Sequence, residues 1–489
     1  MLQLNNIEQF NKTALLYTKN IMLTRSIVLI LFISLPFQLC ATLDLSIDEK
    51  DIILNSAKSK SSTFEQQKLL KEFIRQIRAT GKLNTSPEIS AYIRQLGNKL
   101  NKYGSRNIEF LVLNDKGINA FAGLGGVVVI NTGLILTAKS EGELASVIAH
   151  EIAHVSQYHI ERIIESTSSG ASASLQAILI AAAIVSAGTD PSMSQAALVS
   201  AFALPAEQMV THTRVHEAEA DSIGLKILVN AGYSSDDMAS MFQRFLALNK
   251  FSSSPPQFLL THPLTESRIA SLQNLAQSLQ KSQVKTNNDD FKVIKAILKN
   301  DKLTANELQQ IPSKIVYAIE LYQAGNKELA KDIVKAIKID NKNSKSVYFK
   351  LLLGQFYSIS QQKNLALKWL QKAYQQQTDN LATVIRYSKE LLQQGQTDKA
   401  FKILQLALKI FNNQPEVYKL MAHYYAIEKN IAQSYFWRAK SEFLAGYTKR
   451  AVQQLLIAKK SPNNDFYLSS KIDALIEQYK NVVALEQRK

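Results

Sequence analysis

The chain has 489 residues, a net charge of +16 and a single cysteine, Cys40. With 46% hydrophobic and 20% charged residues its composition is that of a globular protein, and its length predicts two or more domains. The lysines are scattered and not interleaved with aromatic residues, so the positive charge does not predict nucleic acid as a partner. A lone cysteine excludes an internal disulfide, and any metal site must use histidine and carboxylate ligands.

Residues 1–41 are predicted to be a secretory signal peptide, because a positively charged flank precedes an apolar segment at residues 27–37. That segment is too short to span a bilayer comfortably. Cleavage after Ala41 would remove Cys40 and release a soluble, exported protein. Retention of the segment as an anchor and lipidation of Cys40 are the alternatives, and translation can begin at the first methionine or at Met22.

The following stretch changes from a helical to a strand-like pattern. Apolar residues recur at three- and four-residue spacing within residues 42–105, which predicts helices. Between residues 107 and 135, short apolar runs alternate with glycine-containing turns, which predicts a small antiparallel sheet. An edge strand of this sheet would hold an extended substrate by main-chain pairing, and a plain structural hairpin is the alternative. The candidate edge strand is formed by Asn119, Ala120, Phe121 and Ala122.

The chain is organised around an H-E-x-x-H motif formed by His150, Glu151 and His154. Ser140 and Glu143 form a capping box in front of it, and the apolar residues that follow have helical spacing. Residues four apart share a helix face, so the two histidines point to a common position and can bind Zn²⁺. Glu151 can then take a proton from a zinc-bound water.

The alternative is a buried helix whose two histidines are merely hydrogen-bonded. Six of the seven histidines lie between His150 and His262, so histidine is not scattered at random. A glutamate in an apolar run also needs a partner, because burying a carboxylate alone costs several kcal/mol. The sequence therefore favours one zinc ion per chain.

Two apolar runs follow within a segment rich in serine and alanine, at residues 175–187 and 196–204. Neither run is long enough for a transmembrane helix. A flap over the active-site cleft that touches a membrane surface and a buried core hairpin are equal alternatives.

A second motif, E-x-x-A-D, places Glu217 and Asp221 four residues apart on one helix face. Ala220 and Gly224 are also four apart, and their small size lets another helix approach closely. From spacing alone His216 and Glu217 compete to be the third zinc ligand. Asp221 can hydrogen-bond a ligand histidine.

Further candidates lie around these motifs. His262 has three alternative roles: a fourth ligand in a resting state, a donor to the transition state, or a simple cap. Arg214 is an alternative donor to the oxyanion. His159 is expected to be structural, because it lies off the metal-binding face of its helix. Glu219 is about 200° round the helix from Glu217 and is expected to point elsewhere.

The paired motifs resemble those of the CAAX-prenyl-protease-like zinc peptidases, which are gluzincins. In that family the glutamate of E-x-x-A-D is the third zinc ligand, so the resemblance implies Glu217 rather than His216. The candidate edge strand and the segment around His262 and Arg268 also resemble the family. Leu124 departs from it, because exported bacterial members commonly carry proline there. The resemblance covers roughly residues 45 to 275.

The remaining chain has a different character. Residues 276–310 are polar and are predicted to be a linker between a metalloprotease domain at residues 42–275 and a repeat domain at residues 311–489. Ala366 and Ala400 occupy equivalent positions 34 residues apart, which is the tetratricopeptide period. Such repeats stack into a solenoid with a concave binding face, whereas a generic helical bundle would lack the recurrence. His423 is expected to be packed against its tyrosine neighbours.

The predicted fold is therefore mostly α: a gluzincin domain with a small antiparallel sheet, followed by an α-helical solenoid. With the signal peptide, this order resembles the β-barrel assembly-enhancing proteases of the Gram-negative periplasm. The resemblance implies a periplasmic enzyme that degrades misfolded or stalled outer-membrane proteins, assists their assembly, and docks the barrel-assembly machinery through its repeats. A chaperone or scaffold with a latent or structural zinc site is the alternative, and a hydrolase of non-peptide substrates is a third possibility.

Overall fold

The computed structural model describes residues 63–487 except 103, 105, 124, 163–205, 252–255, 280–288, 300–302, 305 and 338–344. These residues belong to one compact unit, Ser62–Lys489. The predicted signal peptide, both apolar runs between residues 175 and 204, and Leu124 lie outside the described residues. No helix within the described ranges combines the length and the apolar character needed to cross a membrane.

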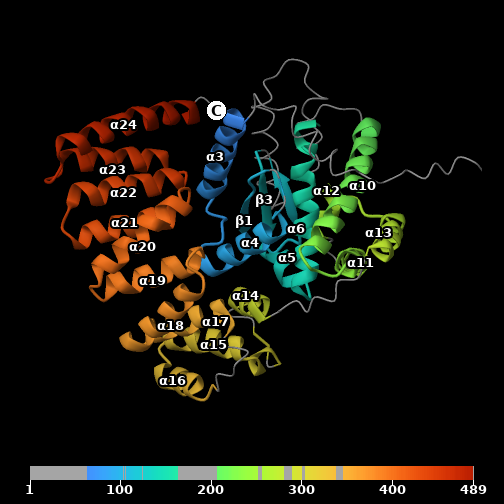
Figure 1. Ribbon diagram of the computed structural model, residues 1–489, viewed down its shortest axis with the longest axis horizontal. Coiled ribbons are helices and arrows are strands. Elements are labelled where there is room, and N and C mark those ends of the chain that lie inside the picture. The colour runs from blue at the N-terminus through green and yellow to red at the C-terminus, as the bar shows by residue number, and fades with distance from the viewer. Residues whose placement is uncertain are drawn as a thin grey trace, which may run out of the picture. The chain divides into compact units, whose positions relative to one another are not determined.

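The fold is mostly helical with one small sheet, which confirms the predicted class (Figure 1). The part that carries the H-E-x-x-H motif contains α3 (Thr63–Ala79), α4 (Pro87–Leu100), β1 (Glu109–Leu113), β2 (Ala120–Gly123), β3 (Val127–Asn131), α5 (Thr132–Thr137), α6 (Glu141–Ser156), α10 (Ala206–Asn230), α11 (Asp236–Phe251), α12 (Phe258–Thr261) and α13 (Glu266–Ser278).

Paired helices make up the rest of the described chain. They are α14 (Asp289–Lys299), the 3₁₀-helix η4 (Glu307–Gln309), α15 (Ile311–Gln323), α16 (Lys327–Lys335), α17 (Val347–Ile359), α18 (Lys363–Gln376), α19 (Leu381–Gln393), α20 (Thr397–Ile410), α21 (Pro415–Ile427), α22 (Ile431–Leu444), α23 (Thr448–Lys460) and α24 (Phe466–Gln487).

The sheet is mixed, so the prediction of an antiparallel sheet was wrong for one pair of strands. The strand order is β1-β3-β2; β3 pairs antiparallel with β2 but parallel with β1. The connection at residues 114–119 is longer than most hairpin turns, and it carries the chain past the place that β3 later fills. The start of this connection is held in place because Gly133 N and Thr132 Oγ1 donate hydrogen bonds to Asp115 O at 2.8 and 2.9 Å. This arrangement leaves β2 at an edge of the sheet.

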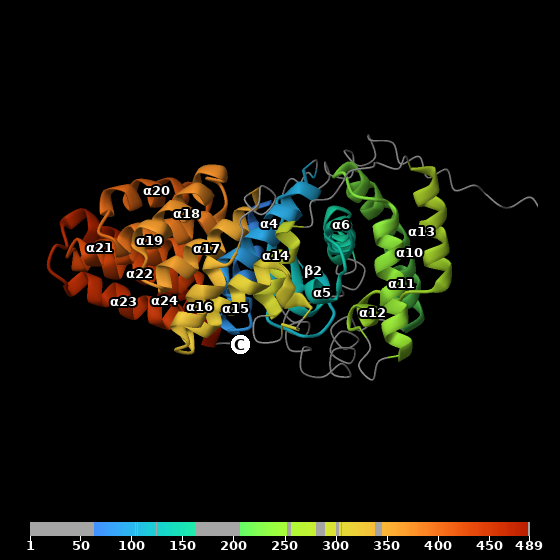
Figure 2. The same cartoon turned by 90° about the horizontal axis from the view of Figure 1, so that it is seen from below.

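Helix α6 begins where the capping box predicts. Ser140 Oγ accepts a hydrogen bond from Glu143 N at 3.0 Å, while the Glu143 carboxylate accepts from Lys139 N at 2.7 Å, one residue earlier than in the usual box. The helix is buried between α4, α10, α11 and strands β2 and β3 (Figure 2). Its polar motif therefore lies in the core of this part of the chain.

Helix α10 approaches α6 closely, as the small residues predict. Ala220 is fully buried, and a Cβ added at Gly224 would lie 3.0 Å from His150 Cα. That distance is tighter than ordinary packing allows. The absence of a side chain at Gly224 therefore brings the two functional motifs together.

The repeats have the expected stacking pattern, in which successive helices lie side by side (Figure 1). Four of these helices each bury a small, a large and another small apolar residue. These residues are Ala366, Leu370 and Ala373 in α18, Ala400, Leu404 and Ala407 in α20, Ala432, Phe436 and Ala439 in α22, and Ala451, Leu455 and Ala458 in α23. His423 is exposed, so the prediction that it is packed was wrong: its position on α21 faces solvent.

The segment predicted to be a linker contains α14. Phe291 and Ile294 are buried on one face of this helix, which packs against α4, α5, α15 and α17. The polar composition of the surrounding residues concealed this apolar stripe, which spans only three turns.

Buried polar contacts join the repeats to the first helices. Arg386 in α19 donates to Glu88 in α4 from Nε at 2.6 Å and from Nη2 at 3.0 Å. Arg75 in α3 donates to Phe443 O at 3.0 Å and to Thr448 Oγ1 at 2.5 Å. Gly446 is needed at the same contact, because a Cβ there would lie 2.3 Å from Arg75 O.

Candidate metal centre

Four buried side chains from three segments meet at the end of the H-E-x-x-H motif. His150 and His154 come from α6, Glu217 from α10, and His262 follows α12. Their ligand atoms all lie within 4.8 Å of one another. His150 Nε2 is 3.1 Å from His154 Nε2 and 3.4 Å from His262 Nδ1. Glu217 Oε1 is 2.9 Å from His262 Nδ1 and 3.4 Å from His154 Nε2.

These separations fit a metal ion. A tetrahedral zinc ion with bonds of about 2.05 Å holds its ligand atoms about 3.3 Å apart. Three imidazole nitrogens and one carboxylate oxygen are also ligands that zinc prefers. Two imidazole Nε2 atoms that face each other at 3.1 Å would otherwise share at most one proton. The geometry and the chemistry of the four groups therefore suit a metal.

The buried charges favour cation binding. Burial would raise the pKa of Glu217, but His262, His150 and His154 outweigh it and hold that pKa well below its usual range. Burial would lower the pKa of His150, but Asp221 and Glu217 raise it to about 10. A bound metal must therefore displace a proton from this group.

Glu151 lies beside this cluster and does not join it. Its side chain is fully buried. His262 Nε2 lies 3.4 Å from Glu151 Oε1. Burial raises the pKa of Glu151, which brings the carboxyl nearer to the range in which it can both accept and return a proton.

Asp221 and Arg268 surround one side of the cluster. Asp221 Oδ1 lies 3.1 Å from His150 Nδ1, where a partner for a ligand histidine was expected. Arg268 donates to both oxygens of Asp221 at 2.8 Å, and its Nη2 lies 3.0 Å from Glu217 Oε2. The sequence did not predict a role for Arg268 at the site, because its partners Asp221 and Glu217 lie on another helix far away in the chain.

Arg214 is not brought to the site. It is exposed on α10, and within the described ranges it makes no ion pair with the cluster. The guanidinium beside Glu217 is that of Arg268 instead. Helical position alone could not show that the Arg214 side chain turns to solvent.

The candidate edge strand lies at an edge of the sheet. Ala120, Phe121 and Ala122 belong to β2, which pairs with β3 on one side only and packs against α6. Asn119 precedes the strand and accepts a hydrogen bond from Asn131 N at 3.0 Å through its main-chain oxygen.

His159 and Glu219 lie closer to the cluster than the sequence predicted. His159 Nδ1 is 2.7 Å from His154 Nδ1, and His159 Nε2 is 3.1 Å from Glu219 Oε2. The prediction assumed that α6 continues past His154 as a regular helix. Instead α6 ends at Ser156, and Tyr158 has a φ of 56° that redirects the chain.

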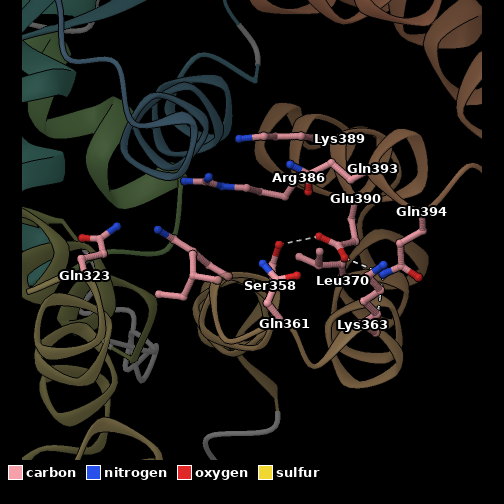
Figure 3. A pocket seen from close by; sticks show the side chains of 12 residues that line it. Gln323, Ser358, Gln361, Lys363, Leu370, Arg386, Lys389, Glu390, Gln393 and Gln394 are labelled. Atoms are coloured by element: carbon pink, nitrogen blue, oxygen red, sulfur yellow. Dashed lines mark hydrogen bonds between the residues drawn. The ribbon is translucent and has the colours of Figure 1, made fainter. Parts of the chain in front are cut away.

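A separate cavity of about 550 Å³ lies in the repeats (Figure 3). It is lined mainly by polar side chains of α17, α18 and α19, including Gln355, Lys363 and Lys389. Within it Glu390 accepts hydrogen bonds from Ser358 Oγ at 2.6 Å and Gln394 Nε2 at 2.5 Å. The hydrogen bonds of Glu390 thus hold part of the polar lining in place.

Comparison with known proteins agrees with this geometry. Residues 84–276 match peptidase family M48, and residues 364–424 match a tetratricopeptide repeat family. The chain is 29% identical over 448 residues to the beta-barrel assembly-enhancing protease of Escherichia coli (strain K12), covering 87% of this chain and 90% of that protein. The Yersinia pestis protein of the same name is 28% identical over 427 residues, 84% of this chain and 87% of its own length.

Another relative matches a smaller share of the chain. The mitochondrial metalloendopeptidase OMA1 of Schizosaccharomyces pombe is 29% identical over 183 residues, which are 37% of this chain and 50% of that protein. These similarities confirm the resemblance that the paired motifs indicated. The chain is therefore a metallopeptidase with tetratricopeptide repeats, and its residues 84–276 are similar to peptidase family M48.

Proposed function

We propose that the chain is a periplasmic zinc endopeptidase that takes part in the quality control of outer-membrane β-barrel proteins. The observation that carries the proposal is the buried group of four donors with Glu151 beside it. The names of the relatives support a role in barrel assembly. The signal-like segment at residues 1–41 supports export to the periplasm.

His150, His154 and Glu217 would hold the zinc ion. When bound, zinc supplies a Lewis acid that polarises the scissile carbonyl and makes a water molecule acidic enough to lose its proton near neutral pH. Glu151 takes the proton from the attacking water and later gives it to the leaving amine. Its burial and raised pKa suit both transfers. Arg268 and Asp221 keep Glu217 and His150 in place through the contacts described above.

The free edge of β2 would bind the substrate. An extended peptide that pairs with this edge lies along α6, because β2 packs against that helix. Main-chain pairing selects for unfolded segments rather than for one sequence. That selectivity suits an enzyme that removes proteins that have failed to fold.

His262 would keep the enzyme latent. It completes a set of four donors, whereas catalytic zinc sites keep one position open for water or substrate. The His262 ring stacks on Phe258 with centroids 4.5 Å apart, and Pro263 follows it directly. Activity would therefore require the segment after α12 to withdraw. A permanently closed site would instead fit the alternative, a chaperone or scaffold.

The repeats would bind the barrel-assembly machinery through the polar cavity between α17 and α19. The glutamine amides of its rim can both donate to and accept from a polypeptide main chain. Charge reversal at Lys389, which lines the cavity, should weaken binding of the purified machinery. The matched control is Lys402→Glu, on an exposed position of α20. Equal binding by both variants would contradict the docking site.

The decisive experiment measures zinc content and cleavage of an unfolded model protein by the mature chain. We expect one zinc per chain in the parent, in Glu151→Gln and in His262→Ala. His262→Ala should cleave faster than the parent, and adding Glu151→Gln to it should abolish cleavage. If these proteins bound zinc but neither the parent nor His262→Ala cleaved the model protein, the endopeptidase proposal would be overturned in favour of the chaperone. Release of the chain by osmotic shock would test its location.

A further inference from the structure

The two ligand histidines of α6 have different partners on their second ring nitrogens. His150 Nδ1 lies 3.1 Å from the Asp221 carboxylate, whereas His154 Nδ1 lies 2.7 Å from His159 Nδ1. We infer that His159 and Glu219 are positioning residues, which fix the ring of His154 for metal binding. The inference rests on the metal site proposed above and extends it to residues outside both motifs.

The hydrogen bonds allow only one arrangement of protons when His154 binds a metal. His154 Nε2 faces the cluster, 3.1 Å from His150 Nε2, so Nδ1 must carry the proton of the neutral ring. That proton points at His159 Nδ1, which must accept it. His159 then carries its own proton on Nε2, 3.1 Å from Glu219 Oε2. Glu219 thus determines the tautomer of His154 through one intervening ring.

The chain positions His159 by an unusual turn. Tyr158 adopts a φ of 56°, a left-handed conformation that ends α6 and turns the next residue back towards the last helical turn. Arg106 supports this turn, because its Nη1 donates to Val155 O at 2.8 Å and its guanidinium lies 4.2 Å from the Tyr158 ring centre. His159 itself is 1% exposed.

Two further contacts stabilise the hydrogen-bonded series of His154, His159 and Glu219. The ring of His159 stacks on that of His216, with centroids 4.3 Å apart and an interplanar angle of 13°. Arg162 Nη1 donates to Glu219 Oε2 at 3.1 Å. A ring that is buried, stacked and hydrogen-bonded at both nitrogens has one orientation. It can therefore fix the orientation of the His154 ring.

The test is the affinity for zinc, measured by competition with a chromophoric chelator. His159→Phe keeps a buried aromatic ring that can stack on His216 but offers no acceptor to His154. We expect it to weaken zinc binding about 10- to 100-fold, the usual effect of losing such a partner. His159→Asn places an amide oxygen near the position of Nδ1, so this variant should retain most of the affinity.

Thermal unfolding of the metal-free proteins separates positioning from a structural role. Equal zinc affinity in the parent and His159→Phe would overturn the inference. The inference would also be overturned if His159→Phe and His159→Asn lost zinc affinity equally and their metal-free forms unfolded at equally lowered temperatures. The test does not measure cleavage, so it is independent of the proposed activity. A parent protein that binds zinc tightly but never cleaves would contradict the proposed peptidase activity and leave the inference about His159 intact.

Discussion

The metal centre and the repeats both consist of buried helices, but they bury opposite kinds of side chain. Helix α6 buries His150 and Glu151 completely, and both are polar groups that lie within or beside the cluster of four metal-binding side chains. Helix α20 buries Ala400, Leu404 and Ala407, which need only the neighbouring helix. The repeats are therefore stabilised by packing within the chain, whereas we expect the metal centre to gain part of its stability from a bound ion.

Metal removal should have the largest effect. Chelation should abolish peptidase activity and lower the free energy of unfolding by about 4 kcal/mol, relative to free zinc at 1,000 times the dissociation constant. The reason is that the donors around Glu217 lose the cation that compensates their burial. Calorimetry with and without zinc measures the difference, and Glu217→Ala should show little response to zinc. If the free energy of unfolding of the parent protein were the same with and without zinc, the contrast between the metal centre and the repeats would be wrong.

A packing change should have nearly as large an effect in the repeats. Leu404→Ala removes a fully buried side chain of α20 and should lower the free energy of unfolding by about 2–5 kcal/mol. Leu406→Ala on the same helix is the matched control, because that side chain is 56% exposed and its loss should matter by less than about 0.5 kcal/mol. Zinc affinity should be the same in both variants. Similar destabilisation by both would contradict the packing pattern.

The contact between the two regions should show a smaller, pH-dependent effect. Arg386 outweighs burial and lowers the pKa of Glu88, so their pairing stabilises the folded chain above the ordinary pKa of a glutamate. Glu88→Gln should cost about 1.5–3 kcal/mol at pH 7. Because a lowered folded pKa stabilises only the ionised form, the difference between parent and variant should shrink as the pH falls below about 4.5. A difference independent of pH in denaturant unfolding would refute this assignment.

The smallest effect is expected at the start of α6. Ser140→Ala removes the side-chain cap of the helix and should lower the free energy of unfolding by about 1 kcal/mol. Ser470→Ala, on an exposed position of α24, should be nearly neutral. If the cap variant also lost zinc affinity tenfold, the metal centre would depend on local helix stability more than the comparison implies.

The features that the sequence predicted are those with short-range causes. The capping box located α6, the spacing of His150 and His154 placed them together, and the 34-residue recurrence revealed the repeats. Ala220 and Gly224 correctly indicated a close helix contact, because small size has the same consequence in any fold.

The remaining features depend on contacts between distant residues. The parallel pairing of β1 with β3 requires that β3 enter the sheet between two earlier strands. Arg268, rather than Arg214, approaches Glu217 because of how α13 meets α10. His159 reaches His154 only because Tyr158 leaves the helical conformation, and nothing in the local spacing predicts a left-handed tyrosine.

The contact of Arg75 with Phe443 and Thr448 has a mechanical consequence. Helix α3 packs Phe73 and Ile77 against the sheet that borders the metal centre. Through Arg75 it also hydrogen-bonds to α22 and α23, near the C-terminal end of the solenoid. A solenoid attached at one end can bend without disturbing the domain that carries it. Here both ends contact the first helices, so a partner that bent the repeats would also displace α3 and the sheet against which it packs. Such a displacement should change the hydrogen-exchange protection of the α3 amides.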